Sequence, residues 1–313
     1  MTLRKRITSS LYNFLYWCGI EVRHVPRGIV MKKETGTIHF SLGKFSLIAP
    51  ADHALPGILA KYPHYSYALG RLAKAVQSKY PRLRVIDVGA NIGDSAAIIR
   101  SQVDAQIACI EGYDKFYQYL LQNIRQFPQV VAFSAFIGDT EKNIGTSIEE
   151  NQGTIRLLPK TGKTKISITT LDKFLEKQPI YKTAQLLKID TDGYDLFVIR
   201  GATNYIKKTQ PVIYLEYAKF CFKELGADGP DTIRQLERVG YTTAIFYDSF
   251  GRFVLSTTLN NHQLLRQLDA YMTKGRGAFP YFDIAFFHQK DTALAQRFIL
   301  EEEKYFHHAD TQK

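Results

Sequence analysis

The feature that most constrains the fold is a regular alternation of short apolar runs with helical patterns between residues 81 and 250. The apolar runs are RVIDVG, QIACIEG, VVAFSAFIG, QLLKID and PVIYLEYA. The intervening DKFYQYLLQNIRQF places Phe116, Leu120 and Ile124 at four-residue steps, which is typical of a helix. Strands that alternate with helices predict an α/β fold with a mainly parallel, doubly wound sheet covered on both faces.

Other patterns lie on either side of this alternation. The late runs TTAIFYD and YFDIAFFH are expected to join the sheet as antiparallel strands, and residues 140–169 are expected to form a loop or hairpin. Ahead of the sheet, GTIHFSLGKFSLIAP predicts a hairpin and YSYALGRLAKAVQSKY a helix. An earlier helix is predicted by apolar residues at helical spacing, namely Leu11, Phe14, Leu15 and Cys18.

These patterns predict three regions. The first is a basic N-terminal extension over residues 1–80, built from a helix, a hairpin and a second helix. The second is the main domain over residues 81–290. The third is a polar tail over residues 291–313, whose last residues are expected to fray.

The net charge of +11 is concentrated at one end of the chain. Residues 1–86 hold 14 Lys/Arg against 3 Asp/Glu, whereas residues 87–313 hold 27 of each. A neutral main domain behind a basic segment suits a phosphorylated acceptor or an anionic membrane surface, and a solvated charged face explains the pattern equally well. Three widely spaced cysteines form neither a disulfide framework nor a paired metal site, and no apolar run reaches the ~20 residues of a membrane span. The expected location is the cytoplasm, or its membrane face if the basic segment binds lipid.

The strongest local signal is the turn VIDVGANIGDS after the first strand. Gly89 allows a tight turn, and Gly93 lets the next helix begin close to the sheet. Ala90 and Asn91 lie between them, where their backbone amides can approach a ligand. The dinucleotide fingerprint is absent, because its second and third glycine positions hold Asn91 and Asp94.

Acidic residues at this edge of the sheet suggest a cationic ligand. Asp87 and Asp94 would repel a pyrophosphate, but they suit the ammonium and sulfonium groups of S-adenosylmethionine. Glu111, at the end of the second strand, is placed to accept both ribose hydroxyls, with Gly112 leaving room for the sugar. Asp139, after the third strand, is a candidate partner for the adenine amino group, and an ordinary turn aspartate is an equally good interpretation.

These motifs resemble those of a known family. VIDVGANIGDS, CIEG, TTLDKFL, LLKIDTDGYDLFVIRGA and PVIYLEYA occur in the order seen in FkbM-type methyltransferases, over residues 64–250. The resemblance implies a Rossmann-like, class I methyltransferase fold that uses S-adenosylmethionine and acts on a hydroxyl oxygen. It carries the cofactor turn onto Asp87, Gly89, Asn91 and Gly93, and the ribose acid onto Glu111. Asp192 replaces a glutamate of the commoner motif, a variant that implies an enzyme of surface-polysaccharide pathways.

Three aspartates follow the fourth strand in KIDTDGYD. Asp190 is the first candidate to orient an acceptor hydroxyl and take its proton, and Asp192 is the second. The two carboxylates are alternatively a site for a Mg²⁺-type ion, since hard cations prefer oxygen ligands. Asp195 is expected to cap the next helix, and Lys188 to neutralise the acidic cluster.

Two further residues are candidate substrate contacts. Glu216, after the fifth strand, is expected either to contact the acceptor or to close a buried network. His64 is a candidate base on the substrate side, although a lone histidine in an aromatic, proline-marked stretch is more often structural.

The resulting hypothesis is an S-adenosylmethionine-dependent O-methyltransferase acting on a saccharide, a glycoconjugate or another small hydroxyl compound. The alternative is a non-catalytic nucleotide-binding or scaffold protein that keeps the fold. A nucleic-acid methyltransferase is disfavoured, because the main domain is neutral and has no Asn/Asp-Pro-Pro-aromatic motif. No nucleic-acid partner is therefore expected, and the sequence predicts no oligomeric state.

Overall fold

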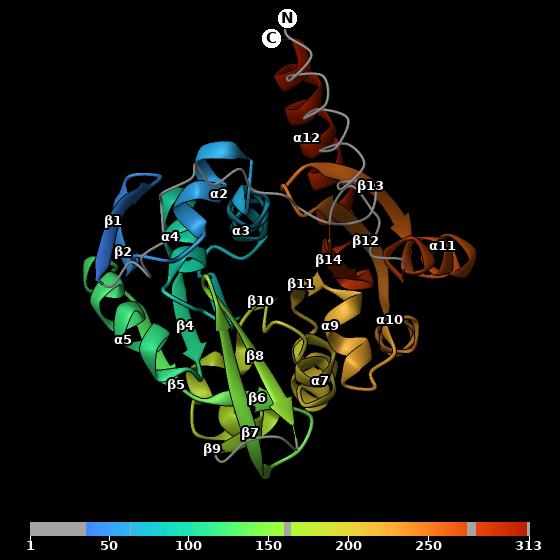
Figure 1. Ribbon diagram of the computed structural model, residues 1–313. Coiled ribbons are helices and arrows are strands. Elements are labelled where there is room, and N and C mark those ends of the chain that lie inside the picture. The colour runs from blue at the N-terminus through green and yellow to red at the C-terminus, as the bar shows by residue number, and fades with distance from the viewer. Residues whose placement is uncertain (1–35, 63, 160–163, 274–279, 312–313) are drawn as a thin grey trace, which may run out of the picture. The chain divides into compact units, whose positions relative to one another are not determined.

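The computed structural model describes residues 36–62, 64–159, 164–273 and 280–311 (Figure 1). From Gly36 onward the described residues belong to one compact unit. The helix predicted over residues 11–18 lies outside the described part of the chain, and the predicted domain limits stay a prediction.

A mixed sheet of eight described strands forms the centre of this unit. In spatial order the strands are β13 Phe253–Thr258, β12 Tyr241–Asp248, β14 Phe282–His288, β11 Val212–Tyr217, β10 Leu186–Ile189, β3 Arg84–Val88, β4 Gln106–Glu111 and β5 Val130–Ser134. The strands from β11 to β5 run parallel, as the alternation predicts. Strand β14 is antiparallel to both of its neighbours, and β13 is antiparallel to β12.

Alternate strand residues face opposite helical layers, because successive side chains of a strand point to opposite faces. One layer packs on Ile86, Ile110 and Ile189, and the other on Val85 and Ile107. The first layer comprises α6 Leu171–Glu176, η2 Pro179–Thr183, α7 Asp195–Arg200, α8 Thr203–Thr209, α9 Lys219–Glu224, α10 Gly229–Arg238 and α11 His262–Thr273. The second comprises α3 Tyr67–Lys79, α4 Asp94–Gln102, α5 Asp114–Asn123 and α12 Thr292–Thr311. The result is a Rossmann-like α/β fold, as predicted.

The third predicted strand divides between two sheets. The apolar run VVAFSAFIG forms β5, which ends at Ser134, and then β6 Phe136–Gly138, which pairs with β9 in a smaller sheet. The strands of this sheet, in the order β6-β9-β7-β8, include β7 Lys142–Asn151, β8 Thr154–Pro159 and β9 Thr164–Thr170. The predicted loop or hairpin over residues 140–169 is therefore three strands.

The predicted N-terminal hairpin is formed by β1 Thr37–Leu42 and β2 Phe45–Pro50, and α2 Leu55–Lys61 follows it. The side chain of Asn123, near the short turn η1 Ile124–Gln126, donates hydrogen bonds of 2.8 Å to the carbonyls of Ile48 and Ile92. One amide thus joins the hairpin to the glycine turn that follows β3.

The polar tail is not frayed over its described residues. After the short turn η3 Gln289–Asp291, α12 continues to Thr311. Phe298 is buried in the core, and buried Glu302 accepts two hydrogen bonds from Arg71 of α3, at 2.5 and 2.8 Å. The apolar anchor and the bidentate ion pair explain the order, and local polarity alone could not predict them.

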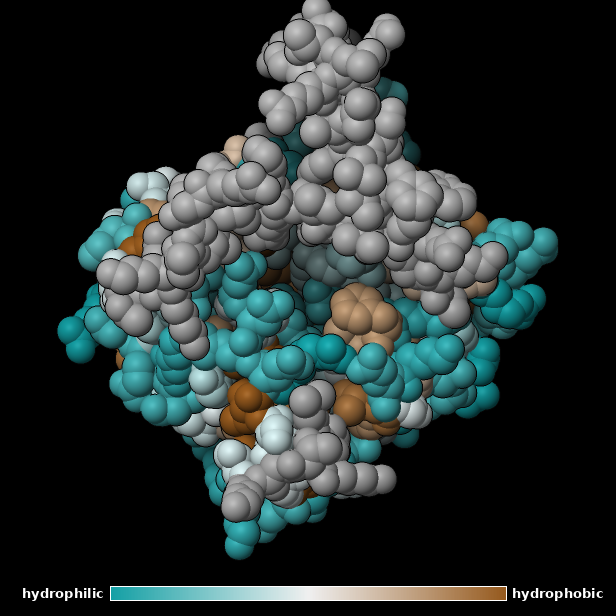
Figure 2. Space-filling view, in the orientation of Figure 1, coloured by the Kyte–Doolittle hydropathy of each residue, from teal (hydrophilic) through white to brown (hydrophobic). Residues whose placement is uncertain are grey.

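The sheet reverses its winding between β3 and β10. From β3 the chain adds β4 and β5 on one side, and it then crosses back to add β10 and β11 on the other. Ligands of open α/β sheets bind at such a reversal, beyond the carboxyl ends of the strands. Figure 2 shows a mainly hydrophilic face with small, separate hydrophobic areas. No helix among the described residues has the length and apolar character that crossing a bilayer requires.

Candidate functional site

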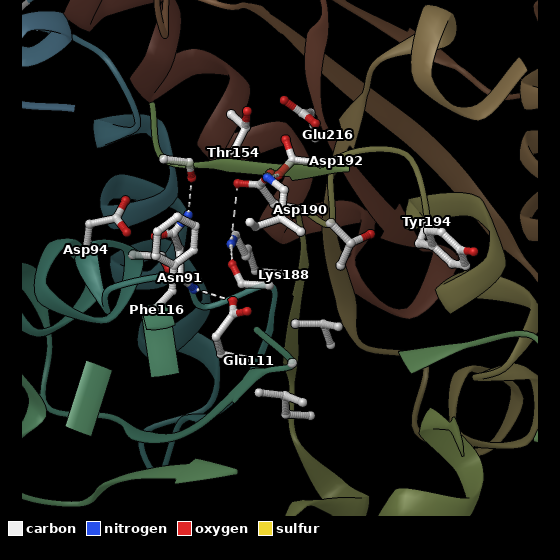
Figure 3. Close-up of a pocket in the computed structure, with 18 of the residues that line it drawn as sticks. Asn91, Asp94, Glu111, Phe116, Thr154, Lys188, Asp190, Asp192, Tyr194 and Glu216 are labelled. Carbon is white, nitrogen blue, oxygen red and sulfur yellow. Dashed lines mark hydrogen bonds and ion pairs between the residues drawn. The ribbon is translucent and has the colours of Figure 1, made fainter. Parts of the chain in front are cut away.

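A cavity of about 300 Å³ lies beyond the carboxyl ends of β3, β4, β10 and β11 (Figure 3). That volume is at the lower end of the range for small-molecule sites. Gly89 and Glu111 line one half of the cavity, and Asp190, Glu216 and Asp283 line the other. The two halves meet where the sheet reverses its winding.

The glycine turn lies directly against the backbone that follows β10. Gly89 has a φ of +78°, and a Cβ on it would lie 1.7 Å from the carbonyl oxygen of Asp190. Gly93 has a φ of +90°, and a Cβ there would lie 2.9 Å from Leu120 of α5. Both positions therefore require glycine, as the motif predicts. Gly93 and Ala90 shape the turn from behind and do not line the cavity.

Glu111 ends β4 at the cavity wall. Its two carboxylate oxygens accept hydrogen bonds from the backbone amides of Asn91, at 2.9 Å, and Tyr113, at 2.7 Å. Burial raises the pKa of Glu111, and these two amides oppose that rise. Each oxygen keeps further lone pairs, so the carboxylate can still accept hydroxyl protons from a ligand. Gly112 also lines the cavity, and a Cβ on it would lie 2.4 Å from the Phe136 ring.

Lys188 holds the two halves of the site together. Its ammonium group donates a 2.8 Å hydrogen bond to the carbonyl of Gly89 and lies 3.1 Å from Asp87 and 3.4 Å from Asp190. Burial opposes the charge, but Asp190, Asp87 and Asp94 together raise the pKa of Lys188 well above its usual value. The lysine is therefore charged although it is only 5 % exposed.

Asp87 lies behind the cavity wall. It is fully buried, and Ser95 donates a 2.6 Å hydrogen bond to it. Its charge is paired with Lys188, so the structure does not bring Asp87 into direct reach of a ligand. Asp94 does line the cavity, and burial raises its pKa to about 6.

The three aspartates after β10 have different environments. Asp190 is 49 % exposed and lines the cavity. Asp192 accepts a 2.9 Å hydrogen bond from the amide of Ile155, and burial followed by the charge of Asp190 raises its pKa to about 7. Asp195 is fully buried and accepts hydrogen bonds from the amides of Thr191 and Gly193. Asp195 lies in the first turn of α7 Asp195–Arg200, but its carboxylate binds amides of the loop before the helix and caps no helical amide.

The β7–β8 hairpin, light green in Figure 1, covers part of the cavity. At its tip, the carbonyl of Gly153 accepts a 2.7 Å hydrogen bond from the Asn91 side chain, and the carbonyl of Gln152 accepts one of 2.9 Å from Ala54. The amide of Ile155 donates to Asp192 on the opposite side. The hairpin therefore connects the glycine turn to the aspartate cluster. Sequence reasoning missed this cover, because its contacts join residues far apart in the chain.

The sequence predicted only one member of a further acidic pair in the cavity. Glu216 of β11 lies directly beside Asp283 of β14 in the strand register, and both line the cavity. Tyr65 and Tyr281 line the same half, with their hydroxyl groups 3.4 Å apart. Each of the segments YLEYA and YFDIAFFH contains one acidic residue among apolar ones. Only the pairing of the two strands shows that these acidic residues are neighbours.

Two predicted site residues lie elsewhere. His64 lies 3.2 Å from the hydroxyl of Tyr305 on α12, and it does not line the cavity. The Asp139 carboxylate lies 3.2 Å from Lys142 and accepts a hydrogen bond from Thr140, also outside the cavity. Both residues make local structural contacts, which is the alternative that their sequence contexts also allowed.

The acidic residues do not form a metal centre. Within the described ranges, no group of three or more His, Cys, Asp or Glu side chains is arranged to hold a metal ion. The predicted alternative of a Mg²⁺-type ion at Asp190 and Asp192 therefore has no support.

Comparison with known proteins identifies the family of this chain. A family model described as the methyltransferase FkbM domain matches residues 87–243, which is half of the chain. The chain belongs to the FkbM methyltransferase family. The matched segment runs from the buried Asp87 of β3 to Thr243 in β12, so it includes Glu111, Asp190 and Glu216 of the cavity but not Asp283.

Individual relatives are distant. "Methyltransferase 1" of Beauveria bassiana (strain ARSEF 2860) is 28% identical over 75 residues, which span 24% of this chain and 30% of that protein. The crystal structure of an FkbM methyltransferase from Methylobacillus flagellatus KT is 13% identical, with a TM-score of 0.42, over 66% of this chain and 44% of that one. The structure of Methanococcus jannaschii TYW2 in complex with AdoMet is 10% identical, with a TM-score of 0.39, over 83% and 90% of the two chains.

The site of this FkbM-family chain fits the methyl donor that the family implies, S-adenosylmethionine. Glu111 keeps acceptor capacity for ribose hydroxyls at the end of β4, and Gly89 leaves no Cβ at the turn. Asp94 and Asp190 add negative charge beside that turn, where a sulfonium and an ammonium group need it.

Proposed function

We propose that this protein transfers the methyl group of S-adenosylmethionine to a hydroxyl oxygen of a saccharide or glycoconjugate. The observation that carries the proposal is the position of Asp190. Asp190 follows the last residue of β10. Its side chain is half exposed and lines the cavity, and its backbone carbonyl lies against Gly89 of the glycine turn. A side chain there lies between a donor bound at the turn and an acceptor bound over β11.

The donor half would hold the cofactor through Glu111 and the glycine turn. When bound, S-adenosylmethionine supplies a methyl group activated by a positively charged sulfur. Glu111 accepts the ribose hydroxyls, and Asp94 faces the cationic part of the ligand. The β7–β8 hairpin excludes water from this side, because its tip bonds to Asn91 and its amide at Ile155 bonds to Asp192.

The acceptor half would align and activate the hydroxyl. Lys188 fixes one carboxylate oxygen of Asp190 at 3.4 Å, which leaves the other oxygen for the acceptor. That oxygen accepts the hydroxyl proton as the acceptor oxygen attacks the methyl carbon. Alignment by such groups lowers the barrier because the reacting atoms need no further reorganisation.

The saccharide assignment is supported by the lining of the acceptor half. Carboxyl and phenol groups from β11, β14 and the segment before α3 are suited to a hydroxyl-rich ligand. The basic residues 1–35 extend the proposal to a peripheral contact with an anionic membrane surface on the cytoplasmic side, where lipid-linked glycans would be met.

Calorimetric titration with S-adenosylhomocysteine tests the donor site. We expect Glu111→Ala to weaken binding by at least about tenfold, since it removes a charged acceptor of two hydrogen bonds, whereas the surface variant Glu176→Gln binds like the parent. Equal affinity of Glu111→Ala and the parent would move the donor elsewhere.

Methyl transfer to sugar-nucleotide and lipid-linked acceptors tests the catalytic assignment. Asp190→Asn should keep the affinity for S-adenosylhomocysteine and lose about 10²- to 10⁴-fold in turnover, the usual contribution of a general base. The exposed Asp104→Asn is the matched control. A protein that binds the cofactor product tightly and methylates nothing would support the non-catalytic alternative.

A further inference from the structure

The half of the cavity between β11, β14 and the segment before α3 has a chemistry that the donor does not need. Its polar lining includes Glu216, Asp283 and three tyrosines, Tyr65, Tyr214 and Tyr281. Glu216 and Asp283 are paired neighbours on adjacent antiparallel strands, so their side chains share one face of the sheet. Two carboxyl groups and three phenols are therefore gathered on one wall.

Positive charge is scarce on this wall. Among the described residues that line the cavity, Lys188 is the sole ammonium or guanidinium group. It is already committed to the carbonyl of Gly89 and to the carboxylates of Asp87 and Asp190. His53 lies on the opposite side beside Asn91, and burial lowers its pKa.

Burial favours the protonated form of both acidic side chains. Burial, followed by the charge of Asp190, raises the pKa of Asp283 to about 8. The same two causes raise the pKa of Glu216 well above its usual value. Protonated carboxyl groups can donate to a hydroxyl oxygen, and they can lose their protons to an approaching cation. An anion finds no uncommitted positive charge among the described lining residues, and it would be repelled by any ionised member of the pair.

Tyr214 lies beside this acidic pair. Its side chain is 5 % exposed. Burial raises the pKa of Tyr214, and the charge of Asp283 and a side-chain interaction with Asp283 add to that rise. Its hydroxyl can donate to one partner and accept from another, so it can bind a ligand hydroxyl while it remains in contact with Asp283.

We propose that Glu216, Asp283 and Tyr214 form an acceptor subsite that takes a hydroxyl-rich, uncharged or amino-bearing ligand and rejects carboxylated and phosphorylated ones. The proposal rests on the function proposed above and narrows its substrate class to neutral sugars and amino sugars at the reacting unit. A phosphate or uronate belonging to the same glycan must then lie outside the cavity.

Saturation-transfer NMR on the full chain, saturated with S-adenosylhomocysteine, tests this selectivity. The probes are glucose, glucosamine, glucuronate and glucose 6-phosphate, which share one ring and differ in charge. We expect signals from glucosamine and glucose, with glucosamine the stronger, and none from the two anions.

Two variants locate the effect. Glu216→Gln and Asp283→Asn should each reduce the advantage of glucosamine over glucose by about fivefold, which is roughly 1 kcal/mol of binding free energy. The surface variant Glu176→Gln should leave it unchanged. Each variant must retain S-adenosylhomocysteine binding, which establishes that it is folded.

Three results would overturn the subsite. They are the absence of binding by both glucose and glucosamine, binding of glucose 6-phosphate as strong as that of glucose, and probe preferences that both variants share with the parent. A parent protein that fails to bind S-adenosylhomocysteine would instead overturn the proposed function, so the two failures are distinguishable.

Discussion

At the residue scale, the charge of the site depends on Lys188. This buried ammonium group lies beside buried Asp87 and half-exposed Asp190, and it also bonds to the turn at Gly89. Its removal would leave Asp87 as an uncompensated buried charge. Such a loss usually costs about 3–5 kcal/mol, more than the intact pair contributes.

We therefore predict that Lys188→Met lowers the free energy of unfolding by about 3 kcal/mol in urea titrations. Asp87→Asn in the same chain should recover most of that loss, because the orphaned charge is then gone. The double-mutant cycle isolates the pair from other effects of each substitution. Additive losses in the double variant would show that the two side chains do not compensate each other.

A second residue-scale prediction concerns the pH dependence of stability. Burial raises the pKa of Asp283 to about 8, so the folded protein holds this proton more tightly than the unfolded chain does. The stabilisation is complete below the unfolded pKa and is lost as the pH rises through about 8. Asn cannot ionise, so Asp283→Asn should melt close to the parent near pH 4 and above it near pH 9, by roughly 5–10 °C. A difference that is constant with pH would contradict the assignment.

At the element scale, the β7–β8 hairpin depends on a close contact at its tip. Gly153 has a φ of +105°, and a Cβ on it would lie 2.6 Å from the ring of His53. Gly226 has a φ of +78° with nothing within 4 Å, so it offers the same backbone strain without the contact. The pair separates the two effects.

We predict that Gly153→Ala lifts the hairpin from the cavity, whereas Gly226→Ala costs stability alone. Hydrogen exchange should accelerate across β7 and β8 in the first variant, and S-adenosylhomocysteine should dissociate several-fold faster. If amide hydrogens of the hairpin exchange equally fast in both variants, the close packing of Gly153 against His53 does not position the hairpin.

The sequence could predict the elements and site residues that have a local signal. Alternating apolar runs and helical patterns predict the parallel strands, because that signal is local. The division of VVAFSAFIG between β5 and β6 carries no local signal, since both halves are apolar and strand-like. Asp190 and Glu111 were predictable because the carboxyl ends of parallel strands meet at one edge. The pairing of Glu216 with Asp283 was not, because 67 residues of chain separate them and only the strand register joins them.

At the scale of the whole molecule, the acidic cavity contrasts with the basic N-terminal sequence. Residues 1–86 carry the entire excess of positive charge. If this segment binds anionic lipid, each basic side chain near the surface contributes about 1 kcal/mol. The combined substitution of Arg4, Lys5 and Arg6 by serine should then release the protein from phosphatidylserine vesicles in sedimentation assays, without changing its affinity for S-adenosylhomocysteine. Vesicle binding that persists in this variant would place the lipid contact elsewhere in the chain, whereas a parent protein that does not bind vesicles would assign the charge to a solvated face.

A cationic methyl donor is expected at the acidic edge where the sheet reverses its winding. A crystal structure of the chain with S-adenosylhomocysteine tests that assignment most directly. We predict that the ribose hydroxyls bond to Glu111 and that the sulfur lies between Gly89 and Asp190. Electron density for the ligand outside this cavity, or a ribose bound to a different acid, would contradict it.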